Sequence, residues 1–142
     1  MPSVPVNVLA LLVAVFVNMA LGFIWYGPLF GKIWIKMMGW SEADIKKAQE
    51  AGMTKSYLLM VFSSFVMAYV LLHSNAFAAA YLQLDGPIVG VMGGFWNWLG
   101  FIAPITISSV LWEGKPWKHW LLNNGYNLVS LILMGVILAS WK

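Results

Sequence analysis

Residues 1–31 read MPSVPVNVLALLVAVFVNMALGFIWYGPLFG and carry no charged side chain. Three later stretches, residues 56–84, 86–112 and 120–141, lack Asp, Glu, Lys and Arg in the same way. Each stretch exceeds the roughly 20 apolar residues that a helix needs to cross the hydrocarbon core of a bilayer. The sequence therefore predicts four membrane-spanning helices, near residues 4–26, 57–79, 88–111 and 120–141.

The composition agrees with a protein embedded in lipid. Hydrophobic residues make up 61% of the chain and charged residues 9%, against about 25% charged residues in an average soluble domain. A chain of 142 residues is expected to form one domain, here the whole of 1–142. Because no basic region precedes the first apolar run, we expect this run to be retained as a span and not cleaved as a signal peptide.

The lysines predict how the helices are oriented. All but Lys142 fall between the first and second predicted spans or between the third and fourth: Lys32, Lys36, Lys46, Lys47, Lys55, Lys115 and Lys118. Loops rich in lysine remain on the cytoplasmic side of a membrane. We therefore expect a multi-pass protein of the inner (cytoplasmic) membrane, with its N- and C-termini outside.

The connection of residues 31–55 predicts a short helix near residues 42–51. Ser41 and Asp44 have the spacing of a capping box, and Trp40 and Ile45 have that of a hydrophobic staple. Gly52 supplies a residue that commonly ends a helix. We expect this helix to lie at the cytoplasmic interface, either as a solvated connector or as a face that binds a partner.

Polar side chains inside the predicted spans are the candidates for a functional site. Such groups turn toward protein or water, because an unpaired polar group in hydrocarbon costs several kcal/mol. The candidate intramembrane lining is Asn18, Tyr69, His73, Asn97, Asn123 and Asn127. Similar depths suggest a layer of amides from Asn18, Asn97 and Asn127, with Asn18 and Asn127 in mutual contact. Two roles stay open for this lining: hydrogen bonds that join helices, or a surface that binds or passes a solute.

Several classes of chemistry find no support in the sequence. The chain has no Cys and no Arg, and no Asp or Glu lies inside a predicted span. Thiolate chemistry, guanidinium clamps on phosphate and proton exchange at a buried carboxylate are therefore excluded. His73 is interpreted as a structural imidazole in preference to a proton carrier. We expect no enzymatic activity, no metal site, no cofactor and no nucleic-acid partner.

The third predicted span contains residues that shape its backbone. Gly90, Gly93 and Gly94 are expected to permit close helix packing, since small residues let helices approach in lipid. Pro104 is expected to kink the helix, because its ring deletes a backbone hydrogen bond.

Two sets of residues together resemble the domain-of-unknown-function 1761 family. The first, at the end of the first span, is Asn18, Gly22, Trp25-Tyr26-Gly27-Pro28-Leu29-Phe30-Gly31-Lys32, Trp34 and Gly39. The second is Gly100-Phe101, Pro104, Glu113-Gly114-Lys115-Pro116-Trp117, Asn123 and Gly125-Tyr126. Its interfacial motif comprises Trp25, Tyr26, Pro28, Gly31, Lys32 and Trp34. The resemblance implies a small bacterial-type membrane protein with four spans and implies no particular activity.

The sequence as a whole predicts an all-α, polytopic four-helix bundle with a short cytoplasmic interfacial helix between spans one and two. The function expected of it is that of a structural or accessory subunit. It would contact the lipid bilayer and form a homo-oligomer or join a larger membrane protein complex. The alternative is a small oligomeric transporter or channel for a neutral or weakly charged solute.

Overall fold

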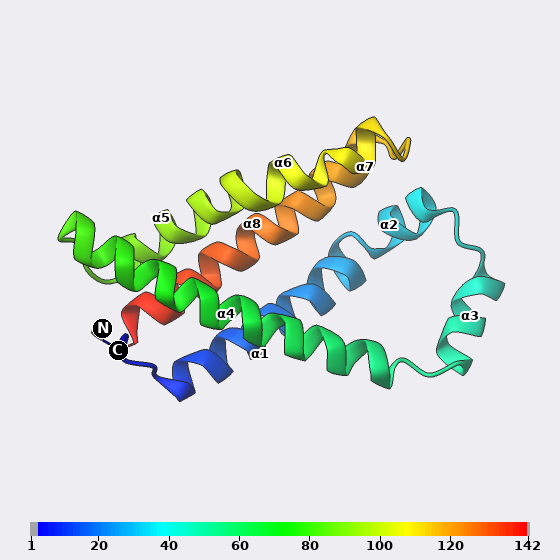
Figure 1. The fold of residues 1–142 in the computed structure, drawn as a ribbon. Helices are drawn as coiled ribbons and strands as arrows, with labels where there is room; N and C mark the ends of the chain where they lie inside the picture. Colours follow the sequence, from blue (N-terminus) through cyan, green and yellow to red (C-terminus); the bar gives the residue numbers. More distant parts are fainter. Residues whose placement is uncertain (1–2, 142) are drawn as a thin grey trace.

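The computed structural model describes residues 3–141, and every regular element in this part of the chain is a helix (Figure 1). The elements follow in the order α1 (Val8–Ile24), η1 (Trp25–Leu29), α2 (Gly31–Met38), α3 (Glu42–Glu50), α4 (Thr54–Leu82), α5 (Pro87–Asn97), η2 (Trp98–Ile102), α6 (Ala103–Thr106), α7 (Ser108–Leu111) and α8 (Trp117–Ser140). The elements η1 and η2 are turns of π-helix.

Four helical segments are long and apolar enough to cross a membrane: Val8–Leu29, Thr54–Leu82, Pro87–Leu111 and Trp117–Ser140. They confirm the four predicted helices and are consistent with a multi-pass membrane protein. The first helix begins later than the expected residue 4, because Asn7 precedes it as a cap. The Asn7 Oδ1 atom accepts a hydrogen bond from the Ala10 amide at 3.1 Å, so Asn7 lies just before the helix and caps its start.

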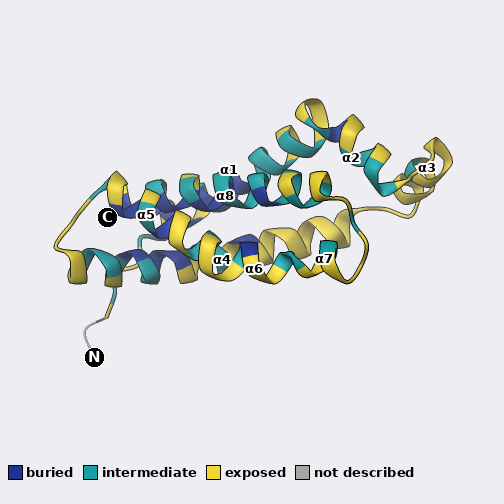
Figure 2. Ribbon diagram, turned by 90° about the horizontal axis from the view of Figure 1, so that it is seen from above, coloured by how far each residue is buried: buried dark blue, intermediate teal, exposed yellow. Residues whose placement is uncertain are grey.

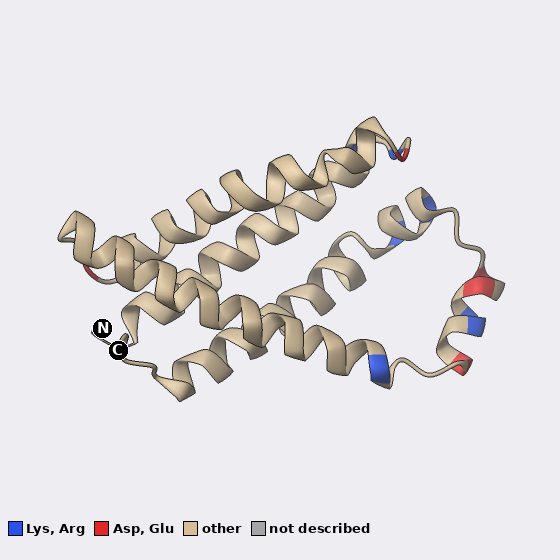
Figure 3. Cartoon of the chain, viewed as in Figure 1, with Lys and Arg blue, Asp and Glu red and all other residues tan. Residues whose placement is uncertain are grey.

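Helices α5 and α8 run side by side, and α4 crosses α1 and diverges from α8 toward the end that carries α2 and α3 (Figure 1). The first span stays in contact with α8 as far as this divergent end, where Tyr26 is bonded to Asn123. Most of the lysines lie at this divergent end, and both ends of the described chain lie at the other (Figure 3). The helices therefore place the lysine-rich loops together on one side, as the charge pattern predicts.

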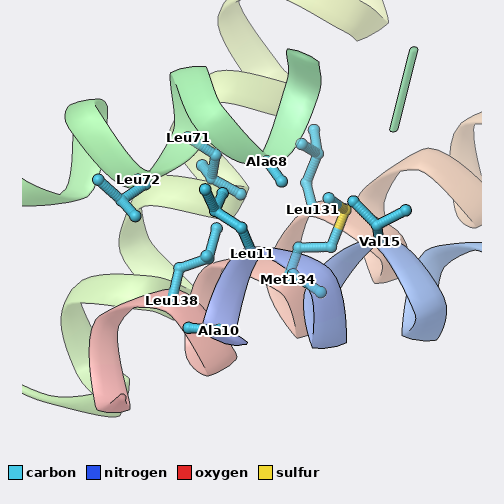
Figure 4. Close-up of a cluster of buried hydrophobic side chains, with 10 residues drawn as sticks. Ala10, Leu11, Val15, Ala68, Leu71, Leu72, Leu131, Met134 and Leu138 are labelled. Carbon is cyan, nitrogen blue, oxygen red and sulfur yellow. The ribbon is translucent and has the colours of Figure 1, made fainter. Parts of the chain in front are cut away.

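The hydrophobic core lies where α1, α4 and α8 meet. Leu11 and Ala14 of α1, Leu71 of α4 and Met134 of α8 belong to one cluster of buried side chains, most of which Figure 4 labels. Burial is unevenly distributed, since α4 is exposed along most of its length in Figure 2. The half of α4 nearest the lysines packs on no neighbour closely enough to bury a residue between Thr54 and Ser63.

Helices α5 and α8 approach closely because glycines face each other across the contact. A Cβ atom added to Gly90 would lie 2.3 Å from the carbonyl carbon and oxygen of Gly135. A Cβ added to Gly94 would lie 2.6 Å from the Leu131 carbonyl oxygen. Gly90 and Gly94 are four residues apart, the spacing that lets membrane helices pack backbone against backbone. The expectation of close packing at these glycines is confirmed.

Each proline inside a long helix stands in or near a π-helical turn. Pro28 lies within η1, where the Phe30 amide donates to the Trp25 carbonyl at 2.9 Å. The wider turn accommodates a ring that would clash with the carbonyl four residues earlier in a regular helix. The first span therefore extends beyond its expected end near residue 26, since helical structure continues to Leu29 and resumes in α2, an element that the sequence did not predict.

The second π-helical turn, η2, ends two residues before Pro104, so the regular α-helix is interrupted next to this proline. Nearby, the Thr106 hydroxyl donates to the Ile102 carbonyl at 2.7 Å. A hydroxyl of this kind satisfies a carbonyl that the distorted helix would otherwise leave unpaired.

The short helix α3 confirms the capping box. The Ser41 amide donates to Asp44 Oδ2 at 2.9 Å, and the Asp44 amide donates to Ser41 Oγ at 3.2 Å. The hydrogen bonds from Ser41 hold the pKa of the Asp44 carboxyl below its ordinary value. Gly52 follows the helix with a φ of +82°, the conformation that favours glycine at a helix end.

Candidate intramembrane polar site

Asn18 joins three of the four long helices through its side chain. Its Nδ2 atom donates to Ser64 Oγ of α4 at 2.7 Å. Its Oδ1 atom accepts from the Tyr126 hydroxyl of α8 at 2.8 Å and from the Ser130 hydroxyl. Asn18 is 2% exposed, so these bonds replace the water that the amide would otherwise need.

This arrangement differs from the expected contact between Asn18 and Asn127. Tyr126 and Ser130 are four residues apart and share one face of α8. Asn127 directly follows Tyr126 in the chain and therefore lies on another face of the helix. Asn127 makes no hydrogen bond within residues 3–141. The sequence reasoning missed Ser64, Tyr126 and Ser130, although the four-residue spacing of Tyr126 and Ser130 was a usable signal.

A second group of polar side chains joins the end of the first span to the start of α8. The Tyr26 hydroxyl donates to Asn123 Oδ1 at 2.8 Å, and Asn123 Nδ2 lies 3.1 Å from His119 Nε2. With the oxygen of the amide engaged by Tyr26, its NH₂ group faces the imidazole, so His119 Nε2 is the acceptor. The proton of neutral His119 is then on Nδ1, a buried atom without a hydrogen-bond partner in the described chain.

The interfacial motif and α8 also interlock through rings and glycines. A Cβ on Gly22 would lie 3.3 Å from the Tyr126 hydroxyl, and a Cβ on Gly125 would lie 3.1 Å from Cζ2 of Trp25. Trp25 Nε1 donates to the Leu122 carbonyl at 3.1 Å. Each helix therefore offers a glycine beside an aromatic ring of the other, which explains why these residue types occur together in the chain.

Within the motif, Gly31 and Trp34 hold the break between η1 and α2. A Cβ on Gly31 would lie 2.6 Å from the Tyr26 carbonyl oxygen, so only glycine fits without a shift. Trp34 stacks edge-on against Tyr26 with ring centroids 5.8 Å apart. Lys32 is exposed on the other side of α2.

A cavity of about 830 Å³ opens beside these residues at the divergent, lysine-rich end. Its lining comes from the first span, α2, α4, α6, α7 and α8. Polar members of the lining include His119, Asn123, Asn124 and Asn127, and Asn124 is bonded to Thr106 of α6 at 3.0 Å. The structure thus brings Asn123 and Asn127 of the predicted lining to one cavity.

The other predicted polar residues lie elsewhere. Asn97 Nδ2 donates to Ser74 Oγ of α4 at 3.0 Å and to the Gly93 carbonyl at 2.8 Å. Asn97 therefore joins α5 to α4 and is not part of a layer with Asn18. Nearby, the buried Asn75 donates to the Gly135 carbonyl at 3.2 Å, an interhelical bond that the sequence reasoning did not foresee.

Tyr69 and His73 face outward from α4 and do not line the interior. Tyr69 is 44% exposed, and its ring centroid lies 4.4 Å from that of His73. His73 Nδ1 lies 2.8 Å from the Tyr69 carbonyl oxygen, one turn earlier in the same helix. Since a carbonyl only accepts, Nδ1 carries the proton of neutral His73 and Nε2 is left as an acceptor.

Comparison with known proteins identifies the family. Residues 9–139 match the family described as "Protein of unknown function (DUF1761)". No curated protein and no solved structure matches the chain. Because the family match covers nearly the whole chain, including the interfacial motif and its partners on α8, the protein belongs to the DUF1761 family.

Proposed function

We propose that this chain is a small, non-enzymatic integral membrane protein that associates with a second copy of itself through the outer face of α4. The role is structural or accessory, and a larger membrane complex could be built on the same pair. A non-enzymatic role is supported by the use of Asn18, Asn97 and Asn124, whose side chains are engaged in bonds between helices.

The observation that carries the proposal is the outward-facing pair of Tyr69 and His73. The Tyr69 hydroxyl is a donor without a partner within residues 3–141, and His73 Nε2 is an acceptor without one. Unpaired polar groups facing hydrocarbon cost free energy. A copy related by a twofold axis would pair each Tyr69 hydroxyl with the other copy's His73 and satisfy both groups twice.

The surroundings of this pair support a helix contact. Five side chains follow one another on this face at spacings of three to four residues: Phe62, Val66, Tyr69, His73 and Phe77. Of these, Phe62, Val66 and Phe77 are each at least 45% exposed. If the lysine-rich loops fix the orientation in the membrane, both copies have the same orientation. The twofold axis would then run along the membrane normal, and residues at the same depth in the two copies would lie together. Tyr69 and His73 are one turn apart, a separation that long side chains can bridge.

The experiment measures self-association in a mild detergent by light scattering coupled to gel filtration. We expect a dimer for the wild type and a dissociation constant weaker by about tenfold for the double variant Tyr69→Phe, His73→Phe, because two bonds of about 0.6 kcal/mol each are lost. Tyr81→Phe is the control, since Tyr81 is an exposed tyrosine at the end of the same helix. A monomeric wild type, or equal dissociation constants, would contradict the proposal.

We further propose that the protein lies in the inner (cytoplasmic) membrane with both termini outside, which the placement of the lysines at one end supports. The chain has no Cys, so in a variant with one introduced cysteine any thiol labelling comes from that position. An impermeant thiol reagent should label Ser3→Cys in intact cells and label Gln49→Cys only after lysis. The reverse pattern would invert the orientation.

A second candidate is a small oligomeric transporter or channel for a neutral or weakly charged solute, favoured by the cavity that holds Asn123 and Asn127. Against it, the fully buried Leu11 and Met134 close the centre of the molecule. Uptake of glycerol into proteoliposomes that is lost in Asn127→Leu would favour this candidate. His73→Gln should leave any such uptake unchanged, because His73 is on the outer face.

A further inference from the structure

We infer that the cavity at the lysine-rich end binds an amphipathic organic cation of single charge. This inference does not depend on self-association, because the lining of the cavity and the face of Tyr69 and His73 share no residue. It rests on the rings, the charge and the shape of the cavity.

Aromatic rings form a large part of the lining. Tyr26, Trp34, Trp120 and Tyr126 all border the cavity. Tyr26 meets Trp34 and Tyr126 edge-on, with interplanar angles of 70° and 61°, so Tyr26 is not stacked flat on either ring. An organic cation is attracted to the face of such rings, and clusters of Tyr and Trp are typical of sites that recognise ammonium groups.

The formal charge of the lining is negative. Glu113 is the one carboxylate that borders the cavity among the described residues, and no lysine borders it. Lys32 and Lys36 are exposed on α2, each two residues from Trp34 and so about half a turn away from it. Lys32 and Lys36 therefore do not border the cavity, and the one formal charge among its described lining residues, that of Glu113, favours a cation over an anion.

The shape suits a bulky apolar body attached to the charge. A volume of about 830 Å³ lies in the range of cavities that hold small organic ligands. Met38, Met53 and Met60 form apolar walls, and the thioether side chains adapt to ligands of different outline. A second hollow of about 350 Å³ between α1 and α4 borders the same two side chains, Met53 and Met60.

The polar floor of the cavity completes the site. Asn127 borders the cavity, and neither its side-chain oxygen nor its NH₂ group makes a hydrogen bond within residues 3–141. The Asn127 side-chain oxygen can accept a hydrogen bond from an N–H of a protonated amine, or attract a quaternary ammonium group through its partial negative charge. The neighbouring Asn123 and Tyr26 are bonded to each other and keep the floor rigid.

The experiment compares two probes of nearly equal size and opposite charge, tetraphenylphosphonium and tetraphenylborate. Binding is measured by quenching of tryptophan fluorescence, with the protein in phosphatidylglycerol nanodiscs and with empty nanodiscs as the blank. We expect the phosphonium ion to bind saturably and at least about tenfold more tightly than the borate ion. Competition by added phosphatidylcholine would assign the cation to a lipid headgroup, and competition by benzyltrimethylammonium alone would assign it to a free compound.

Variants locate the site. Glu113→Gln and Trp34→Leu should each weaken phosphonium binding several-fold, in line with the loss of one charge or one cation–π contact. Glu50→Gln is the matched control, because Glu50 is an exposed acid of α3 at the same end and does not border the cavity. Circular dichroism and light scattering on the same samples verify the fold and the oligomer, so a failed dimer and a failed site are told apart. Equal binding of the two probes, no saturable binding, or unchanged binding in both site variants would overturn the inference.

Discussion

Asn18 shows how much one buried amide can do in a small membrane protein. Its NH₂ group bonds α4 and its oxygen bonds α8, so a single side chain of α1 fixes the distances to two other helices. The sequence predicted that Asn18 is turned inward, because a polar side chain in a span turns toward protein or water. Its partners on α8 were missed, because the sequence reasoning placed Asn127 toward Asn18, whereas the rotation of α8 about its own axis presents Tyr126 and Ser130.

Replacing Asn18 should therefore cost more than replacing Asn127. Asn18→Leu leaves the Ser64, Tyr126 and Ser130 hydroxyls without their partner, and we expect a loss of about 1–3 kcal/mol in the free energy of unfolding. Asn127→Leu breaks no hydrogen bond of the described chain and should change it by less than about 0.5 kcal/mol. Both are measured by unfolding in mixed detergent micelles, followed by tryptophan fluorescence.

The double variant tests whether the two amides interact. Because Asn18 and Asn127 do not share a hydrogen bond, the two effects should add. A coupling energy above about 0.5 kcal/mol would show that the two amides interact directly. Equal losses of stability in the two single variants would show that the hydrogen bonds of Asn18 contribute no more to stability than the side chain of Asn127.

At the scale of elements, the contact between α5 and α8 follows from composition, whereas the π-helical turns do not. Glycines at Gly90 and Gly94 permit a close approach whatever the partner, so the sequence alone indicates a packing face. Pro28 and Pro104 show only that a regular helix is interrupted. Whether the chain then leaves the helix or widens it into η1 or η2 depends on the neighbouring helices, so the span predicted to end near residue 26 continues through η1 to Leu29.

The close approach of α5 and α8 predicts a strong effect of one methyl group. Gly90→Ala places a Cβ within 2.3 Å of the Gly135 backbone, so the helices must move apart. We expect a loss of about 1–3 kcal/mol in the free energy of unfolding from overpacking. Gly100→Ala is the matched control, since a Cβ there meets nothing within 4 Å. Equal stabilities of the two variants would show that the contact is looser than the structure has it.

For the whole molecule, length, apolar composition and lysine placement predict the number of helices and the side on which the loops gather. They do not predict that α4 diverges from α8, because divergence depends on where side chains are large or small along each contact. This divergence opens the cavity and leaves the half of α4 nearest the lysines without a buried residue. Both proposals follow from this open shape: a cation in the cavity and a second copy against α4.

Disulfide cross-linking in native membranes tests the central claim, self-association through the outer face of α4, most directly. The chain has no Cys, so Val66→Cys and Val70→Cys introduce single thiols on this face, and Trp96→Cys introduces one on α5. Val70 and Trp96 are similarly exposed, at 58% and 60%, which makes the comparison fair. With a mild oxidant, the account predicts covalent dimers for the α4 variants and none for Trp96→Cys. Dimers at Trp96→Cys alone, or no dimer at any of the three positions, would contradict it.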